Sequence, residues 1–234
     1  MTLTQIRFSA VTLKRLVVLL MVFDHFAAVF TSHDVAGGLL LRMPGRVVAP
    51  VMCYLIAEGY FRTSNLKKYL LRLFVFAVLS HIPYILYFGL GFWQGTSVMW
   101  ALFLGLAALA VCRNERIPYP IKLLAVGFCC FLAIPANWNY IAVLWIVFFG
   151  LYRGNLQAQI TAFLGIGLFL CVIPAVSGGD WAHLYQLAIL LAVPLMLLYS
   201  GCRGKTSKLS KWGFYVFYPA HLLLLCAVKV IFLG

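Results

Sequence analysis

Apolar segments long enough to cross a membrane follow one another along the whole chain. A helix needs about 20 apolar residues to span the roughly 30 Å hydrocarbon core of a bilayer. Gly, Pro, Asn and charged residues divide this sequence into about nine such segments. They cover residues 12–31, 45–61, 68–88, 97–112, 119–135, 137–152, 156–175, 182–200 and 212–232. The sequence therefore predicts an all-α bundle of about nine transmembrane helices, which forms a single integral membrane domain over residues 1–234.

The composition agrees with a chain whose solvent is the lipid bilayer. Of the 234 residues, 65% are hydrophobic and only 10% are charged, so no sizeable soluble domain is expected. The net charge of +13 lies mostly in loops between apolar segments, where it sets topology, so nucleic acid is not an expected partner. The seven cysteines lack the spacing of metal ligands or of a disulfide framework, and we interpret them as small core residues.

The distribution of Lys and Arg predicts the orientation, because cytoplasmic loops collect basic residues. With the N-terminus inside and nine crossings, fifteen of the eighteen basic residues fall on the cytoplasmic side. The basic N-terminus resembles a signal peptide, but Asp24 and His25 interrupt the apolar run, so we expect a retained first helix. The sequence thus predicts an N-in, C-out protein. Residues 119–135 and 137–152 are short, and a re-entrant pair there stays an alternative.

The apolar run LLMVFDHFAAVF contains Asp24 and His25 where lipid is the solvent. At 1.5 Å per residue, His25 lies about 15 Å beyond Arg15, and His221 lies about 15 Å beyond Lys211. Both imidazoles are therefore expected near the membrane midplane. A single intramembrane histidine is most simply a hydrogen-bonding contact between helices, but several at one depth favour a functional site.

A third histidine and two carboxylates add to this polar layer. His81 follows Arg72 by nine residues and reaches a similar depth if Arg72 extends toward the inner headgroups. A charged side chain at mid-helix costs roughly 2.5–3.5 kcal/mol, so Asp24 and Glu58 should face the protein interior and have partners. Asp24 and His25 point about 100° apart on a helix. We therefore expect each of them to find its partner on another helix.

Helical spacing places further polar residues on common faces. In the second segment Glu58 and Arg62 are four residues apart and can form an ion pair, although a purely structural role explains that pair equally well. Pro219 should kink the last segment, because it cannot donate a backbone hydrogen bond. A stripe in that segment predicts a polar cleft, and it is formed by Lys211, Tyr215, Tyr218 and His221.

Four segments of the chain, in this order, carry a family resemblance: VLLMVFDHFAAVF, RVVAPVMCYLIAEGYFR, LKKYLLRLFVFAVLSHIPY and KWGFYVFYPAHLLLL. They resemble the TraX family, membrane proteins of bacterial conjugation systems that include the F-pilin acetylase and the TrbP proteins of conjugative plasmids. The resemblance implies a multi-pass protein of the bacterial inner membrane. It also implies transfer of an acetyl group from acetyl-CoA to the N-terminus of a conjugative pilin subunit, and no metal is expected.

The resemblance can be followed residue by residue. The matching positions are Asp24 and His25 in the DH of the first helix, Arg46 and Pro50 in the R-x3-P segment, and Tyr218 and His221 in the FYxxHL ending. The turns GTSVMW and NWNYIAV depart from the family pattern. We expect such departures to affect the preference for the donor or for the substrate.

Acetyl transfer to an amine requires a base, because the attacking amine must be deprotonated. An imidazole, with an ordinary pKa of about 6.5, suits that role at cytoplasmic pH. His25 and His221 are the candidate bases, and His81 is a weaker catalytic candidate. Tyr218 is a candidate donor to the developing oxyanion, and Asp24 a candidate for holding a histidine in its basic tautomer.

The phosphates of acetyl-CoA cannot enter lipid and should lie on cytoplasmic basic loops. The expected contacts are Lys67, Lys68, Arg72, Lys205, Lys208 and Lys211. Positive-inside topology explains these residues as well. Further substrate contacts are expected at Arg46, Glu58, Arg62 and Tyr215.

Two other classes of function remain open at this point. A proton-coupled transporter also uses intramembrane His and Asp residues, although no inverted repeat is visible in the hydropathy. A non-catalytic pilus assembly factor would hold the pilin subunit in the membrane without modifying it. Binding of acetyl-CoA distinguishes an acetyltransferase from both classes.

The predicted orientation can be tested with topology reporters. Fusions after Gly154 and Gly204 should report a cytoplasmic location, because these glycines lie in basic loops, directly after Arg153 and Arg203. Fusions after Gly95, Gly179 and Gly234 should report an external location. A cytoplasmic signal from the fusion after Gly234 would contradict nine crossings.

Overall fold

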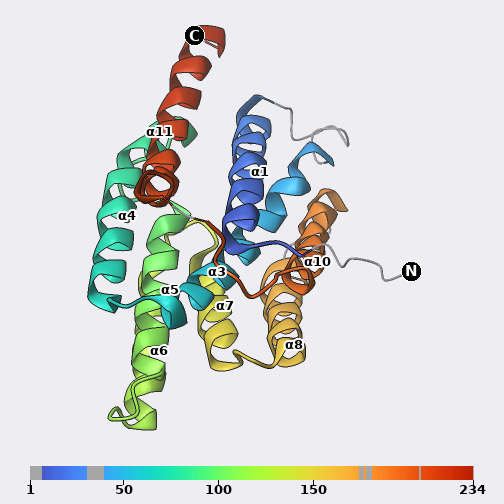
Figure 1. Ribbon diagram of the computed structural model, residues 1–234. Coiled ribbons are helices and arrows are strands. Elements are labelled where there is room, and N and C mark those ends of the chain that lie inside the picture. Colours follow the sequence, from blue (N-terminus) through green and yellow to red (C-terminus); the bar gives the residue numbers. More distant parts are fainter. Residues whose placement is uncertain (1–6, 31–39, 174–176, 178–180, 206, 234) are drawn as a thin grey trace.

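The protein is a bundle of α-helices of unequal length (Figure 1). The computed structural model describes residues 7–30, 40–173, 177, 181–205 and 207–233. Within these residues there are nine α-helices and no strand. The α-helices are α1 (Ala10–Phe30), α3 (Val48–Arg62), α4 (Leu66–Phe88), α5 (Val98–Cys112), α6 (Tyr119–Leu132), α7 (Asn139–Leu151), α8 (Leu156–Gly167), α10 (Ala192–Leu197) and α11 (Lys208–Leu233). Three further helical elements are the 3-10 helices η1 (Pro44–Val47) and η3 (Trp181–Leu191) and the π-helix η2 (Leu168–Val172).

Every segment predicted from hydropathy contains helical structure, so the all-α prediction is confirmed. Among the described residues, three helical stretches are long and apolar enough to cross a membrane, namely Leu40–Arg62, Leu66–Phe88 and Trp212–Phe232, and the nine crossings stay a prediction. The eighth predicted segment differs most from a regular span, since it consists of the 3-10 helix η3 followed by the six-residue α10. Pro194 lies near the start of α10 and cannot donate to the preceding turn.

The most closely packed part of the bundle is centred on α7. The helix packs against α3, α5 and α8, and its Trp145 and Phe149 side chains are fully buried. Two glycines let α5 and α7 approach each other. A methyl group on Gly105 would collide with Ile146, and one on Gly150 would collide with Leu109. Small residues at such crossings allow close backbone contact between membrane helices.

The periphery of the bundle is apolar, as expected for a surface in contact with lipid. The helix α6 has no buried residue, and its Leu123 and Phe128 side chains are largely exposed. The outer face of α4 is similar, with Leu71 and Leu79 exposed. The polar residues of the protein therefore lie mainly in its interior and in its loops.

The last helix changes direction along its length. In Figure 1 one part of α11 is seen nearly end-on, and the part that leads to the C-terminus is seen from the side. Pro219 lies inside the helix and lacks the backbone N–H that would continue the hydrogen-bond ladder. The bend brings Tyr215, Tyr218 and His221 toward α1 and α4.

Candidate functional site

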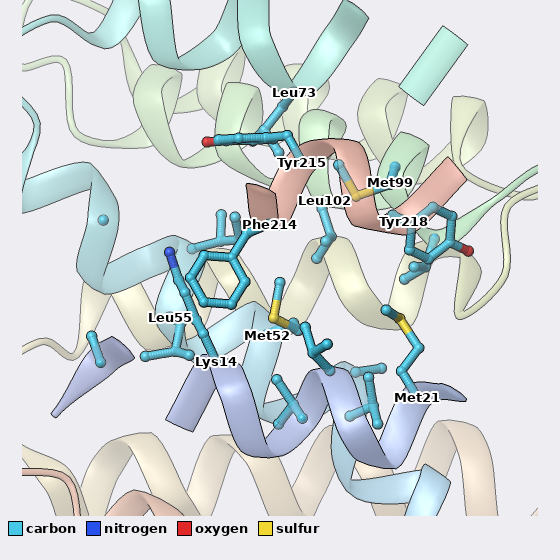
Figure 2. Close-up of a pocket in the computed structure, with 18 of the residues that line it drawn as sticks. Lys14, Met21, Met52, Leu55, Leu73, Met99, Leu102, Phe214, Tyr215 and Tyr218 are labelled. Carbon is cyan, nitrogen blue, oxygen red and sulfur yellow. The ribbon is translucent and has the colours of Figure 1, made fainter. Parts of the chain in front are cut away.

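An elongated cavity of about 270 Å³ lies between α1 and α3, and α4, α5 and α11 close its sides (Figure 2). The two long walls follow helical spacing. The α1 wall consists of Ala10, Val11, Lys14, Val17, Val18, Met21, Asp24 and His25. The opposite wall, on η1 and α3, consists of Gly45, Val48, Ala49, Met52, Leu55, Ile56, Glu58, Gly59 and Arg62. Each set recurs every three or four residues, so one face of each helix borders the cavity.

One end of the cavity is cationic. Its lining there includes Lys14, Arg62, Arg72 and Arg203. The loop containing Arg203 is fixed to the start of α1, because Val11 N–H donates to the Arg203 carbonyl oxygen over 3.2 Å. The Lys14 ammonium lies 5.7 Å from the centroid of the Phe214 ring, which holds it beside the cavity.

The middle of the cavity is apolar. Figure 2 shows Phe214, Met52 and Leu102 around the space between Lys14 at one side and Met21 at the other. Lys14 and His25 are eleven residues apart on α1, which corresponds to a distance of about 16 Å along the helix. The cavity is therefore a narrow apolar passage between a cationic end and an end that contains histidine.

His25 and His221 form a direct hydrogen bond at the other end of the cavity. The distance between His25 Nδ1 and His221 Nε2 is 2.7 Å, and both side chains are buried. The two rings are nearly parallel, with 14° between their planes. The prediction that His25 finds its partner on another helix is confirmed, and the two histidines that were predicted to share one depth do lie together.

The hydrogen bonds of this pair determine its tautomers. His221 Nδ1 lies 3.0 Å from the carbonyl oxygen of Phe217, which can only accept, so Nδ1 carries the hydrogen. In the neutral pair, His221 Nε2 is then the acceptor and His25 Nδ1 the donor. No described residue bonds to His25 Nε2. The free nitrogen lone pair of the two histidines is therefore on His25 Nε2, and His25 lines the cavity.

Asp24 is paired with arginines rather than with a histidine. Its carboxylate accepts two hydrogen bonds from Arg46 Nη2, at 3.1 and 3.3 Å, and lies 3.8 Å from Arg42 Nε. The Arg46 guanidinium also stacks on the Trp138 ring at 5.3 Å. The carbonyl of Phe217, and not Asp24, therefore sets the histidine tautomers. Arg46 was expected to contact the substrate, but it does not line the cavity and instead holds the Asp24 side chain in place.

Gly45 makes this ion pair possible. A methyl group on Gly45 would collide with the side chain of Asp24. The residue precedes Arg46 in the chain, so the absence of a side chain lets η1 approach α1 closely enough for the Arg46–Asp24 contact. Sequence reasoning did not single out this glycine.

Glu58 forms the second ion-pair cluster of the cavity wall. Its carboxylate accepts from Arg62 Nη2 at 2.7 Å and from Arg153 Nε at 2.9 Å. The predicted Glu58–Arg62 pair is confirmed, whereas Arg153 was not predicted. Arg62 also donates to the Gly201 carbonyl oxygen over 2.5 Å, which ties the end of α3 to the loop before α11.

Other predicted residues divide between the cavity and the surface. Tyr215 and Tyr218 line the cavity, as the predicted stripe requires, but Figure 2 shows the Tyr218 hydroxyl on the far side of its ring from Met52. Its role as an oxyanion donor stays a prediction. His81 is not in the lining, and its Nδ1 lies 3.0 Å from Thr96 Oγ1.

The predicted phosphate contacts are only partly in place. Arg72 lines the cavity, but the side chains of Lys67, Lys68 and Lys205 are exposed and do not line it. The side chains of Lys208 and Lys211 lie outside the described part of the structure. Among the described residues, no group of three His, Cys, Asp or Glu side chains is placed to hold a metal ion.

Besides Gly45 and Arg153, three further residues that support or line the site were not predicted from the sequence. Lys14 and Arg203 were treated only as topological charges, although Lys14 shares a helix face with Met21 and His25, and this spacing could have indicated it. Tyr87 is fully buried, and its hydroxyl donates to the His25 carbonyl oxygen over 2.7 Å. No signal in the sequence pointed to that contact.

Comparison with known proteins places the chain among pilus-related membrane proteins. The sequence model of the family described as TraX protein matches residues 9–229. The chain is also similar to a protein of Dichelobacter nodosus called "Probable fimbrial assembly protein FimC, serogroup H1". The two sequences are 31% identical over 239 residues, which cover 96% of this chain and 97% of that protein. No solved structure matches the chain.

The Arg46–Asp24 pair is expected to behave as a coupled unit. The substitution Arg46→Met should lower the free energy of unfolding by about 3–5 kcal/mol, because it leaves a buried carboxylate without its nearest cation. The double substitution Asp24→Asn with Arg46→Met should cost clearly less than the sum of the single ones. Unfolding of the detergent-solubilised variants measures both quantities. Additive effects would show that the two side chains do not interact.

Proposed function

Because the chain belongs to the TraX family, we propose that it is an N-acetyltransferase of the bacterial inner membrane. It moves an acetyl group from acetyl-CoA to the amino terminus of a pilin or fimbrial subunit in the same membrane. The family and the fimbrial-assembly relative indicate a pilus-related role. The observation that carries the enzymatic proposal is the cavity that connects cationic side chains to the His25–His221 pair.

The donor matches the cavity in charge, polarity and length. Its phosphates require cations, which Lys14, Arg72 and Arg203 supply at one end. Its pantetheine arm is narrow and weakly polar. The length of the extended arm is comparable to the distance of about 16 Å between Lys14 and His25 along α1. A thioester at the end of that arm then lies beside His25.

Arg72 is the cation best placed to bind a phosphate. Its guanidinium lies between the Tyr69 and Tyr215 rings, at 5.8 and 5.9 Å from their centroids. Its Nε is buried and has no hydrogen-bond partner among the described residues. A buried donor without a partner costs free energy, so an anion that accepts from it binds favourably. Arg62, by contrast, is already bonded to Glu58 and Gly201.

The reaction follows from the lone pair on His25. The amine of the acceptor must lose a proton as its nitrogen attacks the thioester carbonyl, and His25 Nε2 takes that proton. The new C–N bond forms, the C–S bond breaks, and the thiolate of coenzyme A leaves. The same proton then returns from the histidine pair to the thiolate, so the enzyme ends in its starting state.

His221 supports this proton transfer through the 2.7 Å hydrogen bond. When His25 gains a proton at Nε2, its Nδ1 hydrogen can shift to His221 Nε2, and the positive charge is shared by two rings. The Phe217 carbonyl stabilises the charged form by accepting from His221 Nδ1. Tyr87 holds the backbone of His25 in place. In this scheme His25 is the base and His221 its proton-sharing partner.

The same scheme fits an N-in, C-out orientation with about nine crossings. Lys14, Arg62, Arg72 and Arg203 all belong to the basic residues predicted on the cytoplasmic side. The cationic end of the cavity then faces the compartment that contains acetyl-CoA. The cavity passes from there into the membrane, where the histidine pair lies.

A non-catalytic role in pilus assembly is the second candidate, favoured by the name of the Dichelobacter relative. Binding of acetyl-CoA distinguishes the enzyme from the assembly factor, and it can be measured because a ligand that binds only the folded state raises the melting temperature. Protection of the purified protein by acetyl-CoA, together with a mass increase of one acetyl group on the matured subunit, supports the enzyme. An unmodified subunit in cells that contain the protein supports the assembly factor.

The donor site can be tested by comparing acetyl-CoA with acetyl-pantetheine, a donor that lacks the nucleotide and with it all the phosphates. Arg72→Met and Arg203→Met should each raise KM for acetyl-CoA by about one to two orders of magnitude, because each removes a charge-assisted contact worth about 1.5–3 kcal/mol. KM for acetyl-pantetheine, which lacks the phosphates, should not change. Lys67→Met with Lys68→Met is the matched control, since both side chains are exposed outside the cavity. An equal rise in KM for both donors would show that these arginines do not bind the phosphates of the donor.

The histidine pair should be essential for transfer but not for donor binding. His25→Gln should reduce kcat by at least about a hundredfold, because general-base catalysis contributes about 10²–10⁴. His221→Gln should cost less, since His25 keeps its free nitrogen. Heat protection by acetyl-CoA should persist in both variants. His81→Gln is the control, because His81 lies outside the cavity lining, and a loss of transfer in that variant equal to that in His25→Gln would contradict the assignment.

A further inference from the structure

Three methionines from three different helices converge on the cavity. Met21 lies on α1, Met52 on α3 and Met99 on α5, and all three belong to the lining. The whole chain has six methionines, so half of them border this one space. Figure 2 shows their side chains around a common apolar region beside Tyr218.

Met21 and Met99 are the two that border the histidine end. Met21 precedes His25 by four residues, so both lie on the same face of α1. Met99 lies beside Tyr218 in Figure 2, and the Tyr218 ring contacts the His25 ring edge-on with centroids 6.2 Å apart. Met52 is seven residues from Gly45, which faces Asp24, and therefore lies two turns nearer the cationic end.

We infer that Met21 and Met99 enclose the acyl group of the donor and restrict it to a short chain. The inference rests on the proposed acyltransferase function, since a thioester beside His25 places its acyl group against these two side chains. They are apolar, so they accept a methyl group and offer no partner to a polar acyl group. Met99 is buried, which leaves little room for a longer chain.

The shape of the methionine side chain predicts how truncation should change the length of acyl chain that fits. Its unbranched, flexible side chain fills irregular apolar space closely. Truncation to Ala removes three heavy atoms from the end of the cavity and leaves apolar volume that a longer acyl chain can occupy. Each methylene buried there should improve the use of a donor about fourfold.

The test compares acetyl-CoA, butanoyl-CoA and hexanoyl-CoA as donors for the full-length protein and its natural acceptor. In Met99→Ala and Met21→Ala, the ratio of kcat/KM for butanoyl-CoA to that for acetyl-CoA should rise up to about sixteenfold over the wild-type ratio, because butanoyl has two methylenes more than acetyl. Met99→Leu keeps the volume and should keep the wild-type ratio. Melting temperatures of all variants establish that they are folded.

Met196→Ala provides the matched control. Met196 is buried on α10 and does not line the cavity, so the same substitution creates apolar space away from the donor. Its donor ratio should equal that of the wild type. A rise of the same size in this control, or an unchanged ratio in both Met21→Ala and Met99→Ala, would overturn the inference. A wild-type protein that uses no acyl-CoA at all would instead overturn the proposed function.

Discussion

The absence of hydrogen-bond partners in lipid governs this structure. A polar side chain that enters the membrane must find its partners inside the protein, and the cost of failing is several kcal/mol. Asp24 is satisfied by Arg46, Glu58 by Arg62 and Arg153, and His25 by His221. These contacts join α1 to η1, α3 to the loop after α7, and α1 to α11. The same pairs that solve the solvation problem therefore also fix the helices around the cavity.

The fold was largely predictable because its determinant is local. Hydropathy and helix-breaking residues located all nine helical segments, since each apolar stretch must satisfy its own backbone in lipid. The eighth segment was the least regular, because η3 and α10 replace one continuous helix. Pro219 was identified in advance as the cause of a bend in α11, since proline removes a backbone donor wherever it occurs.

The candidate site was predictable only in part. Depth along the helix brought His25 and His221 to one level, and helical spacing paired Glu58 with Arg62. Partners on different helices depend on how the helices rotate against one another, which no local pattern specifies. Asp24 was therefore correctly expected to have a distant partner, yet the partner is Arg46 and not a histidine. The phosphate contacts were drawn from loop composition, and Lys14 went unnoticed because its role comes from the face it shares with His25.

The helix α3 is anchored at both ends, by Arg46 to Asp24 just before its start and by Glu58 and Arg62 to Arg153 and Gly201 near its end. Its fifteen residues, Val48–Arg62, correspond to about 22 Å. Under the proposed acetyltransferase function, these two anchors fix how far apart the two ends of the cavity lie, and therefore how far the charged head of the donor can lie from its reactive carbonyl. A relative that evolved to use a shorter or longer carrier would keep both histidines and change the number of helical turns between the two anchors.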